Sequence, residues 1–319
     1  MKSLPPLVVA SQLAENMNRL LQERLPDARI LRVPIGAPAS LPPDVPYLYA
    51  HAFPRNAAPE VYARPAGWPF GLKWVQLSSA GIDAYPRWIF DGPVVTNARG
   101  VGAEPIAEYV LAVLFEHAKR LPALWVNDPG HWKQRSLTML RDSTLGIVGM
   151  GPIGNAIARK ALALEMKVMA MRRSDAPFAL PGITRAPDLG TLFERCDAVV
   201  LAAPSTPETR HMVNADVLAR AKPRLHLINI GRGALIDHDA LLAAVERDGL
   251  GRATLDVTDP EPLPAGHPLY AHPKVRISPH TSAISTYIQH AMIDKFLRNL
   301  RAFETGAPME DVVDPDAAY

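Results

Sequence analysis

An apolar stretch, a glycine-rich turn and a helical pattern follow one another in the middle of the chain, and this succession constrains the fold most strongly. The stretch is residues 144–148 (TLGIV), the turn is residues 149–154 (GMGPIG), and the helical pattern covers residues 155–164. A second apolar stretch, residues 167–171, comes next. This order predicts a β-α-β unit, in which a helix joins two parallel strands.

The alternation of strands and helices continues toward the C-terminus. Apolar stretches at residues 197–202, 225–229, 253–257 and 275–278 predict further strands, with helical patterns at residues 188–195, 214–221 and 238–247 between them. Asp237 is placed to cap the last of these helices, and Gly249 to end it. Six short strands separated by helices predict a doubly wound parallel sheet.

The first hundred residues repeat this pattern less regularly. Apolar stretches at residues 7–10, 30–33, 47–50, 74–77 and 94–97 predict strands, so we expect a second, smaller α/β domain. A helical pattern at residues 104–121 is expected to cross from one domain to the other. An amphipathic pattern at residues 286–305, followed by Gly306, predicts a final helix.

Composition narrows the class of protein. The 319 residues correspond to about two domains at roughly 150 residues each. The content of 48% apolar and 21% charged residues excludes an intrinsically disordered chain. A net charge of +2 gives no field for binding nucleic acid or an anionic membrane. Cys196 is the only cysteine, and the N-terminus is a poor signal peptide, so we expect a cytoplasmic protein.

The glycine-rich turn matches G-x-G-x-x-G, a pattern that gains meaning because it follows a strand and opens a helix. Its residues are Gly149, Met150, Gly151, Pro152, Ile153 and Gly154. The first glycine permits the tight turn, the second lets a pyrophosphate approach the backbone, and the third lets helix and strand pack closely. A nucleotide-binding P-loop is excluded, because Asn155 and Ala156 stand where Lys and Ser or Thr are required. The turn therefore predicts dinucleotide binding.

The end of the second strand bears on the choice of dinucleotide. An acidic residue that binds the ribose of NAD normally stands here, and this chain has Arg172, Arg173 and Ser174 instead. Two guanidinium groups and a hydroxyl make a site for a 2′-phosphate. We therefore expect NADP(H) to be preferred, with NAD(H) possible. A pair of solvated surface arginines is the alternative.

Three polar segments follow the carboxyl ends of predicted strands, where ligands bind in doubly wound sheets. They are residues 229–237, 256–264 and 278–280, and they carry Arg232, Glu261 and His280. Taken singly, these could be a salt-bridge former, a solvated loop acid and a helix-cap residue. Their joint occurrence in this order favours one catalytic cleft. Motifs for metal hydrolases and serine hydrolases do not occur in the sequence.

With these segments in view, the chain resembles the D-isomer-specific 2-hydroxyacid dehydrogenases over nearly its whole length. The resemblance includes residues 78–83 (SSAGID), the Ala107-Glu108 pair, the glycine turn, residues 203–209 (APSTPET) and the three polar segments. It implies two doubly wound parallel-sheet domains, with a Rossmann dinucleotide-binding domain at residues 99–283. This domain would be inserted in a smaller flavodoxin-like substrate domain at residues 1–98 and 284–319.

The resemblance also implies roles for individual residues. Arg232 would bind the carboxylate and carbonyl of a 2-keto acid, His280 would be the general acid, and Glu261 would orient the imidazole ring and favour its protonated form. Backbone N–H groups near Ala80 and Gly81 would bind the substrate carboxylate. The cofactor groove would further include Pro204, Thr209, Ile230 and Asp256.

The arginine pair and the short C-terminal tail look most like the glyoxylate/hydroxypyruvate reductase branch. We therefore expect NAD(P)H-dependent reduction of a small 2-keto acid to the D-2-hydroxy acid, by a homodimer. An NAD-dependent phosphoglycerate-type dehydrogenase is one alternative. A dinucleotide-sensing, corepressor-like protein without activity is another.

Overall fold

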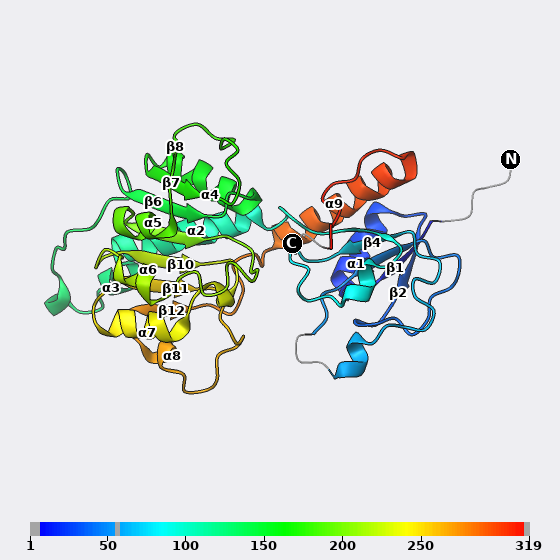
Figure 1. Ribbon diagram of the computed structural model, residues 1–319, viewed down its shortest axis with the longest axis horizontal. Coiled ribbons are helices and arrows are strands. Elements are labelled where there is room, and N and C mark those ends of the chain that lie inside the picture. The colour runs from blue at the N-terminus through cyan, green and yellow to red at the C-terminus, as the bar shows by residue number, and fades with distance from the viewer. Residues whose placement is uncertain (1–6, 55–57, 316–319) are drawn as a thin grey trace. The chain divides into compact units, whose positions relative to one another are not determined.

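The computed structural model describes residues 7–54 and 58–315. Within these residues the chain separates into two compact units, each built on its own parallel sheet (Figure 1). One unit takes in the chain as far as Val101 together with the part from Ser285 onward, and we call it the five-stranded unit. The other runs from Gly102 to Ile284, and we call it the seven-stranded unit.

The strands of the seven-stranded unit are β6 (Thr144–Val148), β7 (Lys167–Met171), β8 (Ile183–Arg185), β9 (Ala198–Leu201), β10 (His226–Asn229), β11 (Arg252–Leu255) and β12 (Val275–Ile277). All pairs are parallel, in the order β12-β11-β10-β9-β6-β7-β8. The first strand along the chain lies inside the sheet, and later strands are added outward on either side of it. This is the strand order of a Rossmann fold, as predicted.

Helices cover both faces of this sheet (Figure 1). They are α2 (Ala103–Lys119), α3 (Leu121–Leu124), α4 (Pro152–Ala163), α5 (Leu189–Arg195), α6 (Ala215–Ala219), α7 (His238–Glu246) and α8 (Pro268–Ala271), with short 3₁₀ turns at Pro129–His131 and Gly233–Leu235. Helix α2 packs against α4, and α6 packs against α5 and α7. Along β9, Ala198 and Val200 join the core under α2 and α4, whereas Val199 and Leu201 join the core under the other helices. This alternation buries the sheet on both faces.

The structure adds to these predictions at two places and corrects them at one. Strand β8 was not predicted, because Ile183–Arg185 is short and holds a single apolar residue. Helix α4 begins at Pro152, ahead of the helical pattern at residues 155–164, since proline is favoured in the first helical turn. The helix predicted at residues 104–121 does not cross between domains: α2 lies wholly within the seven-stranded unit and ends at Arg120, which has a left-handed backbone.

The five-stranded unit has strands β1 (Val8–Ser11), β2 (Arg29–Arg32), β3 (Tyr47–Ala50), β4 (Trp74–Leu77) and β5 (Val94–Thr96). They are parallel in the order β2-β1-β3-β4-β5, which is the flavodoxin-like order. Helix α1 (Glu15–Arg24) packs against α9 (Thr286–Thr305), and 3₁₀ turns lie at Pro59–Tyr62 and Arg87–Phe90. Phe296 of α9 stacks on Trp74 at a ring-centroid distance of 4.9 Å. The C-terminal helix therefore belongs to the core of the unit in which the chain begins.

Candidate active site

The glycine-rich turn joins β6 to α4 with little space around two of its glycines. Gly149 has a φ of +98°, and a side-chain Cβ there would lie 2.7 Å from the carbonyl oxygen of Ala202. A Cβ at Gly154 would overlap the carbonyl oxygen of Gly149. At Gly151, by contrast, a Cβ would meet nothing within 4 Å. The turn thus presents open backbone at Gly151 beside the N-terminus of α4, which fits a pyrophosphate group.

The side chain of Asn155 holds this turn, a role that the sequence analysis missed. Its Nδ2 donates to the carbonyl oxygens of Met150 and Gly151, at 3.0 and 2.9 Å. Its Oδ1 is buried and has no hydrogen-bond partner in the described structure. Met150 itself is buried in the core, Pro152 opens α4, and Ile153 packs partly against the same core.

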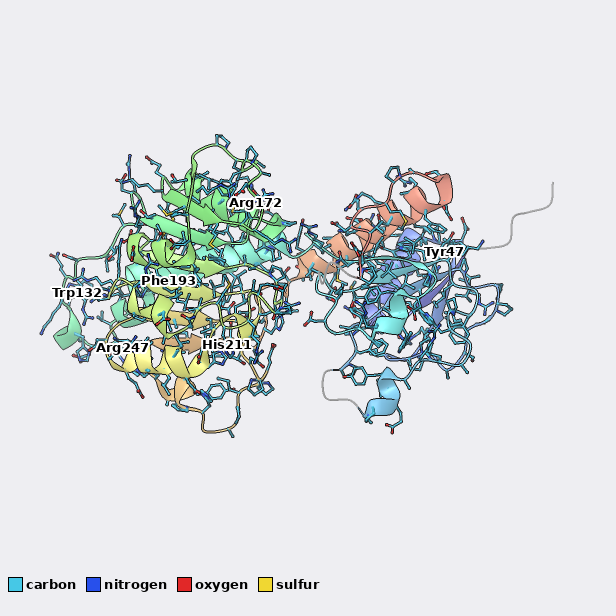
Figure 2. All side chains as sticks on the ribbon, in the orientation of Figure 1. Tyr47, Trp132, Arg172, Phe193, His211 and Arg247 are labelled. Carbon is cyan, nitrogen blue, oxygen red and sulfur yellow. The ribbon has the colours of Figure 1, made fainter. Side chains whose placement is uncertain are left out.

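Arginine side chains gather beyond the end of β7. Arg172, labelled in Figure 2, donates from Nε and Nη2 to Ser174 Oγ at 2.9 and 2.6 Å. Arg185, on β8, donates to the carbonyl oxygens of Ser174 and Ala176 at 3.3 and 2.7 Å. Arg173 is exposed. The pKa of Glu208 is lowered mainly by hydrogen bonds from the Thr206 side chain and the Glu208 backbone, and the charge of Arg173 lowers it further. The segment after β7 is therefore basic, and Arg185 adds a cation that the sequence did not reveal because β8 was not predicted.

The loop that carries Arg232 is fixed by a buried asparagine at the end of β10. Asn229 donates from Nδ2 to the carbonyl oxygen of Arg232 at 2.9 Å and accepts from the N–H of Gly231 at 3.1 Å. The backbone of Gly233 lies so close to Thr258 that a Cβ there would overlap the Thr258 carbonyl carbon. The loops after β10 and β11 are thus packed on each other, and Arg232 lies at the carboxyl edge of the sheet.

Two of the three predicted catalytic residues are brought into contact. His280 Nδ1 lies 2.6 Å from Glu261 Oε1. The His280 side chain is 42% exposed and that of Glu261 is 23% exposed, so part of the imidazole ring is accessible. Both residues stand, like Arg232, on loops that follow neighbouring strands.

Asp256 organises the segment around His280. Its Oδ1 accepts from Ser278 Oγ at 2.6 Å and from the N–H of Thr281 at 2.9 Å, and its Oδ2 accepts from the N–H of Ser282 at 3.1 Å. The N–H of His280 donates to the Asp256 carbonyl oxygen at 2.9 Å. A carboxylate offers about four acceptor positions, and three of them are used here. The carboxylate of Asp256 is 1% exposed, so its main role in this structure is to hold the backbone around His280.

The remaining predicted site residues occupy three regions, each after the end of a strand. The loop after β9 holds Pro204 and Thr209, with Thr209 Oγ1 donating to the Pro204 carbonyl oxygen at 2.8 Å. Ile230 follows β10 and is buried in the core under α2 and α4. Ala80 and Gly81 lie in the five-stranded unit after β4, where the Ala80 carbonyl oxygen accepts from Asn97 Nδ2 at 2.9 Å.

Two other kinds of feature, a metal centre and a membrane-spanning helix, do not occur in the described residues. No group of three or more His, Cys, Asp or Glu side chains in residues 7–54 and 58–315 is arranged to hold a metal ion. Over the same residues, no helix has the length and apolar character needed to cross a membrane.

Comparison with known proteins places these features in context. Residues 111–282 match the family described as "D-isomer specific 2-hydroxyacid dehydrogenase, NAD binding domain". An uncharacterised protein of Corynebacterium melassecola is 36% identical over 267 residues, which cover 79% of this chain and 85% of that protein. Glyoxylate/hydroxypyruvate reductase A of Serratia proteamaculans is 31% identical over 260 residues, covering 78% and 82%. A D-isomer specific 2-hydroxyacid dehydrogenase from Xanthobacter autotrophicus, solved in complex with NADPH and MES, superposes with a TM-score of 0.81, 26% identity and coverage of 99% and 100%.

Proposed function

Because the chain belongs to the D-isomer specific 2-hydroxyacid dehydrogenase family, we propose that it reduces a small 2-keto acid, of the glyoxylate or hydroxypyruvate kind, to the D-2-hydroxy acid. The similarity to a glyoxylate/hydroxypyruvate reductase supports this substrate class. The main support for this reaction type is the contact between His280 Nδ1 and Glu261 Oε1. It lies at the carboxyl edge of the seven-stranded sheet, the edge at which the glycine turn follows β6.

The chemistry assigned to the protein side chains is proton transfer and anion binding. A bound nicotinamide dinucleotide supplies the hydride that adds to the keto carbon. His280 donates the proton from Nε2 to the carbonyl oxygen, because Nδ1 faces Glu261. Glu261 accepts from Nδ1–H, which fixes the ring orientation and stabilises the imidazolium. Arg232 binds the substrate carboxylate and carbonyl through its planar set of donors.

NADP(H) is the dinucleotide that we propose this chain prefers. The support is the basic segment after β7, where Arg172 and Ser174 are hydrogen-bonded to each other and Arg185 lies beside them. No acidic residue stands at the Arg172 position to bind a ribose 2′-hydroxyl or to repel a 2′-phosphate.

The seven-stranded unit is the proposed dinucleotide-binding domain and the five-stranded unit the proposed substrate domain. Contacts of Ala80 and Gly81 with the substrate carboxylate, and of Pro204, Thr209, Ile230 and Asp256 with the cofactor, are part of this proposal. So is a cytoplasmic location, which rests on the sequence alone.

A homodimer is the proposed assembly, and the segment after α2 is its proposed contact. Trp125 is 77% exposed and Trp132 is 79% exposed, and Figure 2 shows Trp132 at the margin of the seven-stranded unit. Large exposed apolar side chains close together on one segment are typical of an interface. Sedimentation of the wild-type protein and of Trp132→Glu at matched concentrations tests this: a dimer that dissociates in the variant supports the proposal, and a wild-type monomer contradicts it.

Initial rates of NADPH and NADH oxidation with glyoxylate, hydroxypyruvate, pyruvate and phosphohydroxypyruvate test the reaction. Rapid NADPH oxidation with the small keto acids is the expected result. A preference for phosphohydroxypyruvate would favour a phosphoglycerate-type dehydrogenase instead. Binding of NADPH without turnover of any keto acid would favour a dinucleotide sensor.

A further inference from the structure

A chain of hydroxyl groups runs from helix α2 to the segment that carries His280. The Tyr109 hydroxyl on α2 lies 2.6 Å from Ser278 Oγ, and Ser278 Oγ donates to Asp256 Oδ1 at 2.6 Å. Because a serine hydroxyl has one hydrogen, which Ser278 gives to the carboxylate, Tyr109 must be the donor in the first bond. Burial raises the pKa of the Tyr109 hydroxyl, which keeps it protonated for this role.

The carboxylate of Asp256, which accepts the last of these hydrogen bonds, holds the backbone on both sides of His280. Asp256 accepts from Ser278, two residues before the histidine, and from the N–H groups of Thr281 and Ser282 after it. His280 itself has a φ of +49°, in the left-handed region that non-glycine residues avoid. Such a conformation persists only where surrounding contacts impose it.

We propose that Tyr109 and Ser278 are positioning residues for His280, acting through the carboxylate of Asp256. This inference rests on the proposed function, because it gives His280 the role of proton donor. The two hydroxyls orient the carboxylate, the carboxylate fixes the turn, and the turn directs the imidazole toward Glu261. Proton transfer is sensitive to small displacements of the donor, so loosening this turn lowers turnover without removing any group that touches the substrate.

The surroundings of the two hydroxyl groups determine how much each substitution should lower turnover. Tyr109 and Ser278 line a cavity of about 270 Å³, together with side chains that include Arg252 and Arg276. Water can enter this cavity, whose lining includes charged side chains, and replace a lost tyrosine hydroxyl. Loss of the Ser278 hydroxyl instead leaves the carboxylate of Asp256, which is 1% exposed and does not line the cavity, without one of its donors. The serine substitution is therefore the more damaging one.

Kinetics of three variants test the proposal. Tyr109→Phe is expected to lower kcat by roughly 3–10-fold and Ser278→Ala by roughly 10–100-fold, the range for a lost hydrogen bond and a buried acceptor left unsatisfied. KM for the keto acid should stay within about twofold of wild type, since no contact with this substrate is removed. Ser278→Thr keeps the hydroxyl and should therefore keep kcat close to that of the wild type.

A matched control separates this role from a general loss of packing. Tyr49 lies in the five-stranded unit, and its hydroxyl donates to the Met292 carbonyl oxygen at 3.2 Å. Tyr49→Phe removes one comparable hydrogen bond outside the network and should leave kcat unchanged. A fall in kcat equal to that of Tyr109→Phe would show a nonspecific effect and overturn the proposal.

Amide hydrogen exchange gives a readout that does not depend on turnover. Faster exchange at Thr281 and Ser282 in Ser278→Ala, with unchanged exchange in β6, is the expected result. Unchanged exchange at these amides, or wild-type kcat in both Tyr109→Phe and Ser278→Ala, would overturn the positioning role. If the wild-type protein reduces no keto acid, the proposed function fails, and the exchange measurement still decides whether the hydroxyl chain holds the turn.

Discussion

His280 Nδ1 and Glu261 Oε1 are 2.6 Å apart, although 18 residues separate the two in the sequence. A hydrogen bond accepted by a carboxylate is stronger than one between neutral groups. This contact leaves Nε2 as the ring nitrogen available to a substrate. In the proposed reaction the two nitrogens of this side chain have different tasks: Nδ1 is held by Glu261, and Nε2 would transfer the proton.

Replacing the carboxylate partner should reduce turnover while leaving substrate binding largely intact. Glu261→Gln keeps the shape of the side chain and removes its charge, so the imidazolium loses stabilisation. The expected fall in kcat is roughly 10–100-fold, the usual worth of a hydrogen bond to a charged group. Steady-state kinetics with glyoxylate and NADPH measure it. Wild-type kcat in this variant would show that Glu261 does not assist His280.

The arginine pair after β7 can be tested by comparing two cofactors in one variant. Arg172→Ala combined with Arg173→Ala should raise KM for NADPH at least about tenfold, and KM for NADH by much less, because only NADPH carries the 2′-phosphate. Arg247→Ala changes an exposed arginine on the α7 side of the unit and is the control (Figure 2). Equal effects of the double substitution on both cofactors would mean that the pair does not recognise the phosphate.

Two glycines of the same turn should respond differently to the same substitution. Gly151→Ala places a methyl group where nothing lies within 4 Å, so the melting temperature should be unchanged while the dissociation constant for NADPH rises. Gly154→Ala forces a Cβ against the backbone of Gly149, so both stability and binding should be lost. Thermal unfolding and NADPH fluorescence titration measure the two effects. Full NADPH affinity in Gly151→Ala would show that no ligand approaches that backbone.

Buried histidines predict how stability depends on pH. Burial holds the pKa of His226 well below its usual value, with further lowering from the nearby His117 and Arg252. His226 Nε2 is 2.8 Å from Thr254 Oγ1, and its ring centroid is 4.8 Å from that of His117. Burial likewise lowers the pKa of His117 and of His238.

Whether stability rises or falls with pH depends on which state, folded or unfolded, takes up protons more readily. The unfolded chain protonates these histidines below about pH 6.5, whereas the folded protein keeps them neutral to lower pH. Their stabilising contribution is therefore complete above about pH 6.5 and is lost as pH falls toward the lowered folded pKa. The melting temperature should drop between about pH 7 and pH 5, and His226→Gln should weaken that dependence. The control substitution His290→Gln, at an exposed histidine, should leave the pH dependence of the melting temperature unchanged. A melting temperature that rises on acidification would contradict this account.

Much of the fold could be predicted because the signals are local. Residues 144–148 and 167–171 are strands in the structure with the predicted bounds, and Asp237 caps α7 by accepting from the N–H of Ala240 at 3.0 Å, as expected. The strand β8 could not be predicted, since Ile183–Arg185 has one apolar residue and is held mainly by its pairing with β7. Pairing of this kind leaves no periodic pattern in the sequence.

The candidate site, like the fold, could be predicted from the sequence only in part. Motifs at strand ends predict Arg232, Glu261 and His280 as site residues, but no motif gives the contacts that hold them. Tyr109 appears in the sequence only as one residue of a helical apolar stretch, and its partner Ser278 lies 169 residues further along the chain. Such contacts depend on how α2 packs over the sheet, which local sequence does not specify.

His280 is the proposed proton donor of the keto acid reduction, and His280→Gln tests this role most directly. Single-turnover oxidation of NADPH by glyoxylate should slow by roughly 10²–10⁴-fold in this variant, the usual worth of a general acid. NADPH affinity, measured by fluorescence titration, should stay close to that of the wild type. Wild-type turnover in His280→Gln would contradict the assignment, whatever the cofactor preference proves to be.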